Sequence, residues 1–390
     1  MALTKIDISL MENTGTTANK LLVYDGSGNL PAVDASQLTN VSTGITESSS
    51  DPTISTNPAG GVGTEWMNTT SGEVYICTDA TAGANVWTNV GAGSGDVAPW
   101  SYQGDAYAYS QGGQRDGAST SNVIDRWSLT TDGNAVDVGD LTQATQSSTG
   151  SSDGDYGYVS AGQSGTTVDS VERFAFGSSV TCADIGTLSV GHNEDPGGSY
   201  TATRAYIHNG GGTNVIERFA FGSSVTGVDV GDAVWSGNGH GGANSPTYGY
   251  IAGGSSTAAS NIQKYSYAAT ANSVDVGNLV TSSTYVGENA NSQTHGYIMG
   301  GHNGAYLNVI QKWAYSSDSN STDVGNLLYT GNSTQGAASA THAYCVGGGN
   351  ASSQFQNIQK VPFATDGDST NVGTLSGSSP QTSMCSVNQP

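Results

Sequence analysis

Short runs of alternating apolar and small or polar residues follow one another from about residue 97 to the end of the chain, separated by turns rich in Gly, Ser and Asn. Alternation with a period of two is typical of β-strands that bury one face. Gly, β-branched residues and Asn all disfavour helices, and 56 of the 390 residues are Gly. The pattern therefore predicts an all-β protein built from antiparallel strands.

Three short signatures recur in the same order, in six copies. The first is a small residue, Tyr, two variable residues and Gly, with its Tyr at 109, 158, 206, 250, 297 and 344. The second is similar to Asn-Val-Ile-Gln-Lys-Trp, with its central Ile or Val at 124, 171, 216, 262, 310 and 358. The third is similar to Asp-Val-Gly-Asn-Leu, with its Gly at 139, 186, 231, 277, 325 and 373. A period of 45 to 48 residues fits four-stranded propeller blades, and closure of six blades removes exposed sheet edges. We expect a six-bladed β-propeller over residues 96–390, with a linear β-solenoid as the alternative.

The spacing inside the repeat separates a constant part from a variable part. The second-signature Ile or Val precedes the third-signature Gly by 15 residues in all six copies, whereas the first-signature Tyr precedes that Ile or Val by 10 to 15. Constant spacing indicates a fixed hairpin register, and variable length indicates a surface loop. The six variable loops should lie on one face. The segment Thr382–Val387 falls where the strand before Tyr stands in other copies, and is predicted to complete the first blade.

One basic residue occupies the same place in every second signature. A symmetric turn would put it opposite an acid, which predicts cross-strand ion pairs worth about 0.2–1 kcal/mol each if exposed. The predicted pairs are Arg126–Asp137, Arg173–Asp184, Arg218–Asp229, Lys264–Asp275 and Lys312–Asp323. In the sixth copy Lys360 would meet Asn371. The functional alternative is a ring of cations that binds an anion.

A second repeated position lies two residues before each first-signature Tyr, on the same side of the strand. It holds Tyr107, Tyr156, Arg204, Tyr248, His295 and His342. These side chains are expected to pack between neighbouring blades; a lining of the central channel is the sharper alternative.

Two further segments precede the repeats. Residues 1–45 contain a short, polar hairpin that is too small to bury a core and needs a partner. Residues 46–95 are expected to form a small β-module in which Trp66, Tyr75 and Trp87 anchor three strands around the turn from Asn68 to Gly72. Its last residues, Gly91–Gly95, read as a flexible linker.

Charge and composition limit the chemistry. The net charge of −22 opposes binding to a phosphate backbone, so no nucleic-acid partner is expected. The four Cys residues form no paired or metal-binding spacing, and no apolar run reaches the length of a membrane span. No nucleophilic triad, phosphate-binding loop or metal-ligand spacing is present, so we predict neither an enzyme nor a cofactor. Sequence alone leaves open a pair of carboxylates for glycoside hydrolysis.

The signatures Gly-Tyr-Ile-Met-Gly-Gly (296–301), Asn-Val-Ile-Gln-Lys-Trp-Ala-Tyr (308–315) and Asp-Val-Gly-Asn-Leu (323–327) resemble kelch-like propeller repeats of virion and tail-fibre proteins from marine tailed bacteriophages of the cyanophage type. The segments at 21–41 and 48–91 resemble adaptor segments of the same proteins, so the resemblance covers nearly the whole chain. It implies a virion protein, assembled in the host cytoplasm, that attaches to other virion proteins through its N-terminal segment, often as a homotrimer. It also implies recognition of the host surface by the distal domain.

The variable loops are rich in Ser, Gly, Asn and aromatic residues, as antibody loops are. A surface glycan or a protein would suit such loops. The candidate ligand-facing residues are Arg115, Asp116, His302, Asn303, Tyr306, Asn350 and Phe355. The alternative is a structural component of the particle, such as a decoration, connector or fibre-spacer protein, with no receptor.

Overall fold

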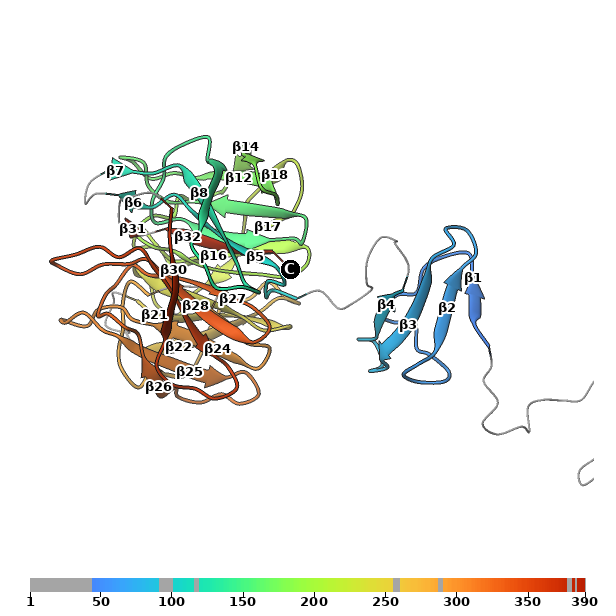
Figure 1. Ribbon diagram of the computed structural model, residues 1–390. Coiled ribbons are helices and arrows are strands. Elements are labelled where there is room, and N and C mark those ends of the chain that lie inside the picture. Colours follow the sequence, from blue (N-terminus) through green and yellow to red (C-terminus); the bar gives the residue numbers. More distant parts are fainter. Residues whose placement is uncertain are drawn as a thin grey trace, which may run out of the picture. The chain divides into compact units, whose positions relative to one another are not determined.

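A computed structural model describes residues 44–90, 101–115, 119–254, 260–286, 290–376, 381–382 and 384–389. Within these ranges every regular element is a β-strand, which confirms the predicted all-β class (Figure 1). The chain divides into two compact units, described over residues 44–90 and from residue 101 onward. No helix among these residues has the length and apolarity to cross a membrane. Residues 1–43, nearly all of the expected attachment segment, lie outside the described part of the chain.

The first unit is a single sheet of four strands in the order β1-β2-β3-β4. Their bounds are β1 (Thr46–Ser48), β2 (Glu65–Asn68), β3 (Val74–Asp79) and β4 (Val86–Asn89). Trp66, Tyr75 and Trp87 lie on the three predicted strands, and the N–H of Gly72 donates to the carbonyl of Asn68 at 2.8 Å to close the predicted turn. The rings of Trp66 and Trp87 meet edge to face at 5.8 Å. Strand β1, which pairs in parallel with β2, was not predicted.

In the second unit each sequence repeat forms its own sheet, and the strands follow the signatures in chain order. The first sheet contains β5 (Tyr107–Gln111), β8 (Val123–Ser128) and β9 (Val136–Asp140), with β13 (Val180–Thr181) and β32 (Cys385–Gln389) at its edges. The second contains β10 (Thr149–Ser152), β11 (Tyr156–Ser160), β12 (Ser170–Ala175), β14 (Ala183–Thr187) and β18 (Val225–Thr226). The third contains β15 (Gly197–Tyr200), β16 (Arg204–His208), β17 (Val215–Ala220) and β19 (Val228–Asp232).

The last three repeats form three more sheets. The fourth sheet contains β20 (His240–Asn244), β21 (Tyr248–Gly253), β22 (Asn261–Ser266) and β23 (Val274–Asn278). The fifth contains β24 (His295–Met299), β25 (Val309–Ala314) and β26 (Thr322–Asn326). The sixth contains β27 (Gln335–Ala338), β28 (His342–Val346), β29 (Asn357–Pro362) and β30 (Thr370–Thr374). A small separate sheet joins β31 (Gln381–Thr382), β6 (Gln114–Arg115) and β7 (Ser119–Thr120).

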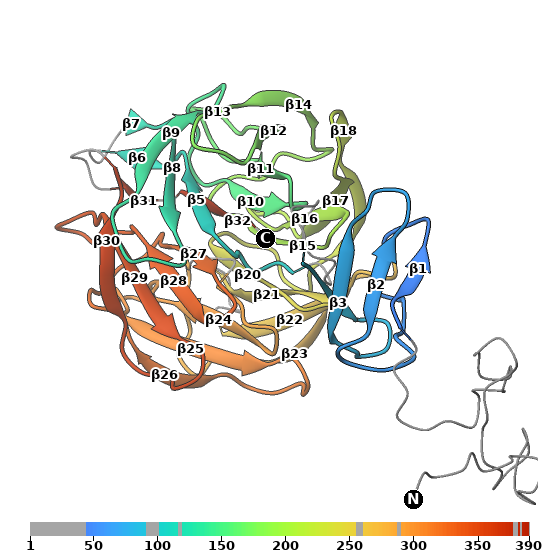
Figure 2. The same cartoon turned by 45° about the vertical axis from the view of Figure 1, so that its right-hand side comes forward.

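The C-terminal strand completes the first sheet, as predicted. Strand β32 pairs antiparallel with β5, with Val387 opposite Tyr109. It also contacts β10 and β27, the first strands of the second and sixth sheets. Figure 2 shows β32 in the middle of this unit, near β10, β15, β20 and β27. The two ends of the repeat region are therefore joined by backbone pairing.

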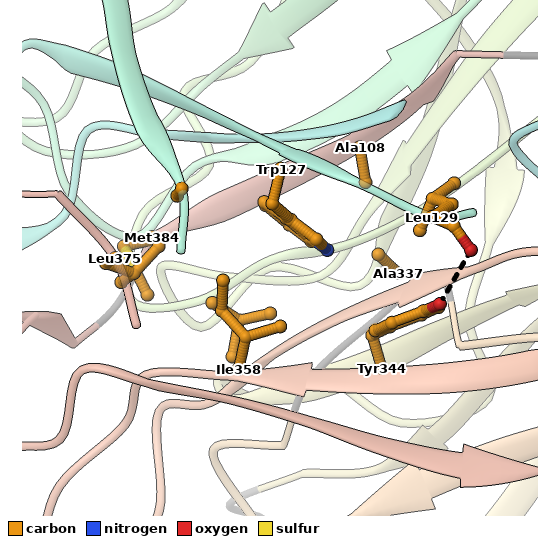
Figure 3. Packing of buried hydrophobic residues seen from close by; sticks show 10 residues of the cluster. Ala108, Trp127, Leu129, Ala337, Tyr344, Ile358, Leu375 and Met384 are labelled. Carbon is orange, nitrogen blue, oxygen red and sulfur yellow. Dashed lines mark hydrogen bonds between the residues drawn. The ribbon is translucent and has the colours of Figure 1, made fainter. Parts of the chain in front are cut away.

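Neighbouring sheets meet through contacts that recur from repeat to repeat. The third-signature Gly of each sheet lies where any Cβ would clash with a backbone carbonyl of the next repeat. The residues met are Val180, Val225, Ala271, Ser319, Gly367 and, from the sixth repeat, Gly133 of the first. The sixth and first repeats also share a hydrophobic core. One cluster joins Ala108, Trp127 and Leu129 of the first repeat to Tyr344 and Ile358 of the sixth (Figure 3).

Each strand that carries a first signature runs between two kinds of connection. Short turns at 153–155, 201–203, 245–247, 292–294 and 339–341 precede it, and the variable loops follow it. We call these the turn end and the loop end of the sheets. The second unit begins at the turn end, where the Tyr102 hydroxyl donates to Ser292 O at 2.8 Å and the Gly104 N–H donates to Ala338 O at 2.8 Å.

Candidate functional site

The predicted cross-strand ion pairs are wrong in register by one residue. A β-bulge follows the Ile or Val of each second signature, so Arg126 lies opposite Val136, and Asp137 lies opposite Asp125. The same shift occurs in every other repeat. In the fourth and fifth repeats Lys264 binds Asp318 and Lys312 binds Asp366, both at 2.6 Å. Each of these bridges leads to the following repeat rather than across the hairpin.

The bases of the other repeats also reach toward their neighbours or stack on aromatic rings. Lys360, expected opposite Asn371, binds Asp132 of the first repeat. The Arg173 guanidinium donates to the carbonyl of Gly222 in the next repeat at 2.9 Å. The rings of Tyr107 and Tyr156 each lie 4.2 Å from the guanidinium of Arg126 and Arg173, and Arg218 occupies the same register position opposite Val228. In the first and second repeats, therefore, the residue at the second repeated position stacks on the base of its own repeat.

The predicted acidic partners instead support the bulge. The first carboxylate oxygen of each accepts the N–H of the Gly two residues later, at 3.0 to 3.2 Å, in the pairs Asp137–Gly139, Asp184–Gly186, Asp229–Gly231, Asp275–Gly277 and Asp323–Gly325. An Asp side chain that accepts the backbone N–H two residues later is a common feature of turns. Their role in the described repeats is therefore local.

Sequence reasoning missed a buried side chain that links each repeat to the one before it. It stands directly before the base in the second signature. Its side-chain oxygen accepts a backbone N–H from a residue that follows the third signature of the preceding repeat. The pairs, each with the acceptor side chain first and the donor N–H second, are Glu172–Thr142, Glu217–Ser189, Gln263–Val234, Gln311–Thr281, Gln359–Leu328 and, from the first repeat back to the sixth, Asp125–Ser376. The signal was an acid or amide at a position that alternation places on the buried face.

Three histidines are buried around the third and fourth sheets. His192 Nε2 lies 3.3 Å from a carboxylate oxygen of Glu217, and both side chains are fully buried. Burial raises the pKa of Glu217, but hydrogen bonds from His192 and Ser189 outweigh it and hold that pKa below its usual value. Burial lowers the pKa of His240 to about 4 and that of His208 well below its ordinary value. None of the ring nitrogens of His208 and His240 has a hydrogen-bond partner in the described residues.

Two aromatic pairs stand at the loop end of the fifth and sixth repeats. His302 and Tyr306, both predicted to face a ligand, pack edge to face with ring centres 5.1 Å apart. Phe355 stacks on Tyr329, with ring centres 4.9 Å apart and planes 16° from parallel. Tyr329 is 42% exposed and was not predicted. The only sign of Tyr329 in the sequence is an aromatic residue directly after Leu328, and this position lies outside the variable loops.

The other loop residues predicted to face a ligand make local contacts or lie elsewhere. Asn303 is exposed, and its side chain accepts the N–H of Ala305 at 3.4 Å. Asn350 supports its own loop, since its side chain accepts the N–H groups of Ser352 and Ser353 at 3.0 Å and donates to the carbonyl of Thr330. Arg115 lies on β6, and Asp116 lies outside the described residues.

The middle of the loop end holds residues from four repeats with a left-handed backbone. Ser147, Glu194, Asp195, Tyr285 and Ser333 have φ between 50° and 58°. A backbone relay joins this group: Tyr285 donates to the carbonyl of Gly239, and Ser333 donates to that of Tyr285. Burial and the nearby Glu194 raise the pKa of Asp195. The structure thus brings two carboxylates and a phenol together at this place, which the sequence did not predict.

The described residues hold no group of three or more His, Cys, Asp or Glu side chains placed to bind a metal ion. No protein-family model matches this chain, and neither does any curated protein. Function has to be argued from the repeat itself and from the residues at its two ends.

Proposed function

We propose that the six sheets of the second unit are the blades of a closed six-bladed β-propeller of the kelch-like type. Three sets of contacts support this proposal, because each leads from one repeat to the next and from the sixth to the first. They are the third-signature glycines, the buried acid or amide before each base, and the base itself in four of the six repeats. They end in the contacts Gly373–Gly133, Asp125–Ser376 and Lys360–Asp132. A linear solenoid would leave its terminal repeats without these partners.

We infer that the protein is a structural component of a tailed-phage virion that recognises the host cell surface with the loop end of the propeller. The stacked pair formed by exposed Tyr329 and half-buried Phe355 carries this proposal. Large exposed aromatic side chains with few rotatable bonds are favourable contacts for a glycan or protein ligand. The N-terminal segment would join other virion proteins, with trimer formation as the resemblance implies.

The direction of the chain agrees with this assignment. The second unit begins at the turn end, and the variable loops lie at the opposite ends of the same strands. The loop end is therefore not the end at which the chain enters the second unit. The proposed function is binding and includes no catalytic step.

A second candidate function is a connector or decoration protein that binds only other virion proteins. Val234, Val280 and Leu328 occupy the same position in three successive repeats and are 41%, 61% and 47% exposed. A row of exposed apolar side chains is typical of a protein interface. This row favours a lateral contact with a particle protein.

Adsorption experiments separate the two candidates. Labelled full-length protein should bind host cells and block infection, and the double variant Tyr329→Ala, Phe355→Ala should lose at least tenfold in affinity, about 1.4 kcal/mol. Val274→Thr, an exposed change on β23 away from the loop end, is the matched control. Absence of cell binding, together with binding to particles that lack this protein, would overturn the receptor proposal in favour of the second candidate. That binding should then be lost in Val280→Ser.

A further inference from the structure

Four grooves follow one another at the turn end of the sheets. They measure about 260, 480, 350 and 300 Å³. Consecutive grooves share lining residues: Pro246 lines the first two, His295 the second and third, and Thr341 the third and fourth. The grooves are therefore contiguous and extend over repeats three to six and onto Leu129 of the first repeat.

The second, third and fourth grooves are built from equivalent positions of successive repeats. His295 and Lys312 line the third groove, and His342 and Lys360 line the fourth; Tyr248 lines the second groove, and Lys264 lies over its ring without lining the groove. A preceding Thr fixes the imidazoles: Thr294 Oγ1 lies 2.8 Å from Nδ1 of His295, and Thr341 holds His342 at the same distance. Repetition of these positions gives the grooves similar chemistry at intervals of one repeat.

The electrostatics of the grooves favour an uncharged ligand. Lys312 and Lys360 are each neutralised by an Asp of the adjoining repeat. Burial, together with the nearby ammonium groups, lowers the pKa values of His295 and His342, so both imidazoles are neutral at pH 7. The net charge of −22 repels anionic polymers. Apart from Asp105, which lines the groove of about 300 Å³, the remaining hydrogen-bonding groups carry no net charge, and they stand beside aromatic surface from Tyr248 and Tyr315.

We propose that these grooves bind a linear, neutral polysaccharide, with successive sugar units in successive grooves. A sugar ring offers an apolar face to Tyr248 and Phe363 and hydroxyl groups to Thr294, His295 and Gln293. The volumes of the four grooves lie at or near the lower end of the range for small-ligand sites. A polymer of repeated units matches a surface of repeated grooves, and successive contacts raise its affinity. This site is separate from the loop end and does not depend on the proposed receptor function.

Calorimetric titration of the full chain tests the proposal with maltohexaose, cellohexaose and laminarihexaose. At least one should bind, its disaccharide should bind at least tenfold more weakly, and hexagalacturonate should not bind. Tyr248→Ala and His295→Ala should each reduce the affinity at least tenfold. Tyr156→Ala is the matched control, since this ring stacks on Arg173 in the same way but lines none of the four grooves.

Two results would overturn the glycan site: no binding of any neutral hexasaccharide at about 10 mM, or binding that Tyr248→Ala and His295→Ala leave unchanged while circular dichroism shows native folding. The loop-end variant Tyr329→Ala, Phe355→Ala should bind the hexasaccharide normally. Failure of the glycan site and failure of the receptor proposal are thereby distinguished.

Discussion

The phenol of Tyr344 donates a hydrogen bond of 3.1 Å to the carbonyl oxygen of Leu129, although 215 residues separate the two (Figure 3). In other repeats the first-signature Tyr packs on an aromatic ring of the next repeat, as Tyr109 does on Phe176 at 5.2 Å. Leu129 occupies the equivalent place in the first repeat. The contact between the sixth and first sheets is thus one more instance of the contact between consecutive sheets.

Deleting residues 381–390 should destabilise the second unit severely. The deletion removes β32, its pairing with β5, and the Asn388 amide that donates to the carbonyl of Tyr102 at 3.0 Å. Buried Val387 and Cys385 would also be lost. Thermal unfolding should show a large fall in Tm, or no folded protein at all. Deletion of residues 1–43 is the control and should leave the Tm of the second unit nearly unchanged; equal effects would contradict a clasp role for β32.

Gly373→Ala should destabilise the protein by about 3 kcal/mol, the upper part of the range for overpacked sites. The new Cβ would clash with the carbonyl oxygen of Gly133, so the sixth and first sheets would have to separate. Gly133→Ala is the matched control, because its Cβ would meet nothing within 4 Å. Urea unfolding of both variants measures the difference. Similar free energies of unfolding would show that this contact does not hold the sheets together.

The six copies and their main hairpins could be predicted because the 15-residue spacing is constant. The register of those hairpins could not, because a bulge adds one residue to the strand that carries the third signature. A Gly inside a strand is a known sign of a bulge, and Gly139 and its equivalents carried that sign. Without the bulge, a symmetric turn put Lys312 opposite Asp323 and suggested the wrong partner.

The true partners of the bases follow a rule that links neighbouring repeats. The relevant position lies six residues after the base of a repeat. Where that position holds Asp, as at Asp318 and Asp366, the base of the repeat before it is Lys. Where it has Ser or Thr, as at Ser224, the preceding base is Arg, and Arg173 bonds the Gly222 carbonyl instead. The residue types were visible in the sequence. Their contact was not, since it depends on which turn the next sheet brings alongside.

Glu217→Ala should cost at least about 3 kcal/mol, because it leaves two backbone N–H groups and the buried His192 ring without their acceptor, at about 1–3 kcal/mol for each unsatisfied group. Its carboxylate accepts the backbone N–H groups of Ser189 and Val190 and faces His192. Glu217→Gln keeps an acceptor for the backbone, as Gln311 does in the fifth repeat, and should cost less than about 2 kcal/mol. Denaturant unfolding at pH 7 measures both. Equal losses would show that the charge of Glu217, rather than its bonds to the backbone, is what matters.

The stability of the second unit should fall as the pH is lowered from 6.5 toward 4. The pKa of His240 is about 4 in the folded protein because the ring is 2% exposed, whereas the unfolded value is about 6.5. Between these values the unfolded chain binds more protons, so the stability is fully present above pH 6.5 and is lost as the pH falls. A shift of this size corresponds to about 3 kcal/mol. The pKa of His208 is lowered in the same direction and adds to the effect.

His240→Gln removes the titrating group and tests this assignment. Urea unfolding at pH 7.5 and pH 4.5 should show a loss of stability in the wild type that is about 2–3 kcal/mol larger than in His240→Gln. The comparison uses each protein as its own reference, so a general weakening by the substitution cancels. His208→Gln should reduce the pH dependence in the same sense, since both rings are buried and their nitrogens have no hydrogen-bond partner among the described residues. An identical pH-dependent loss in all three proteins would place the acid sensitivity in other groups.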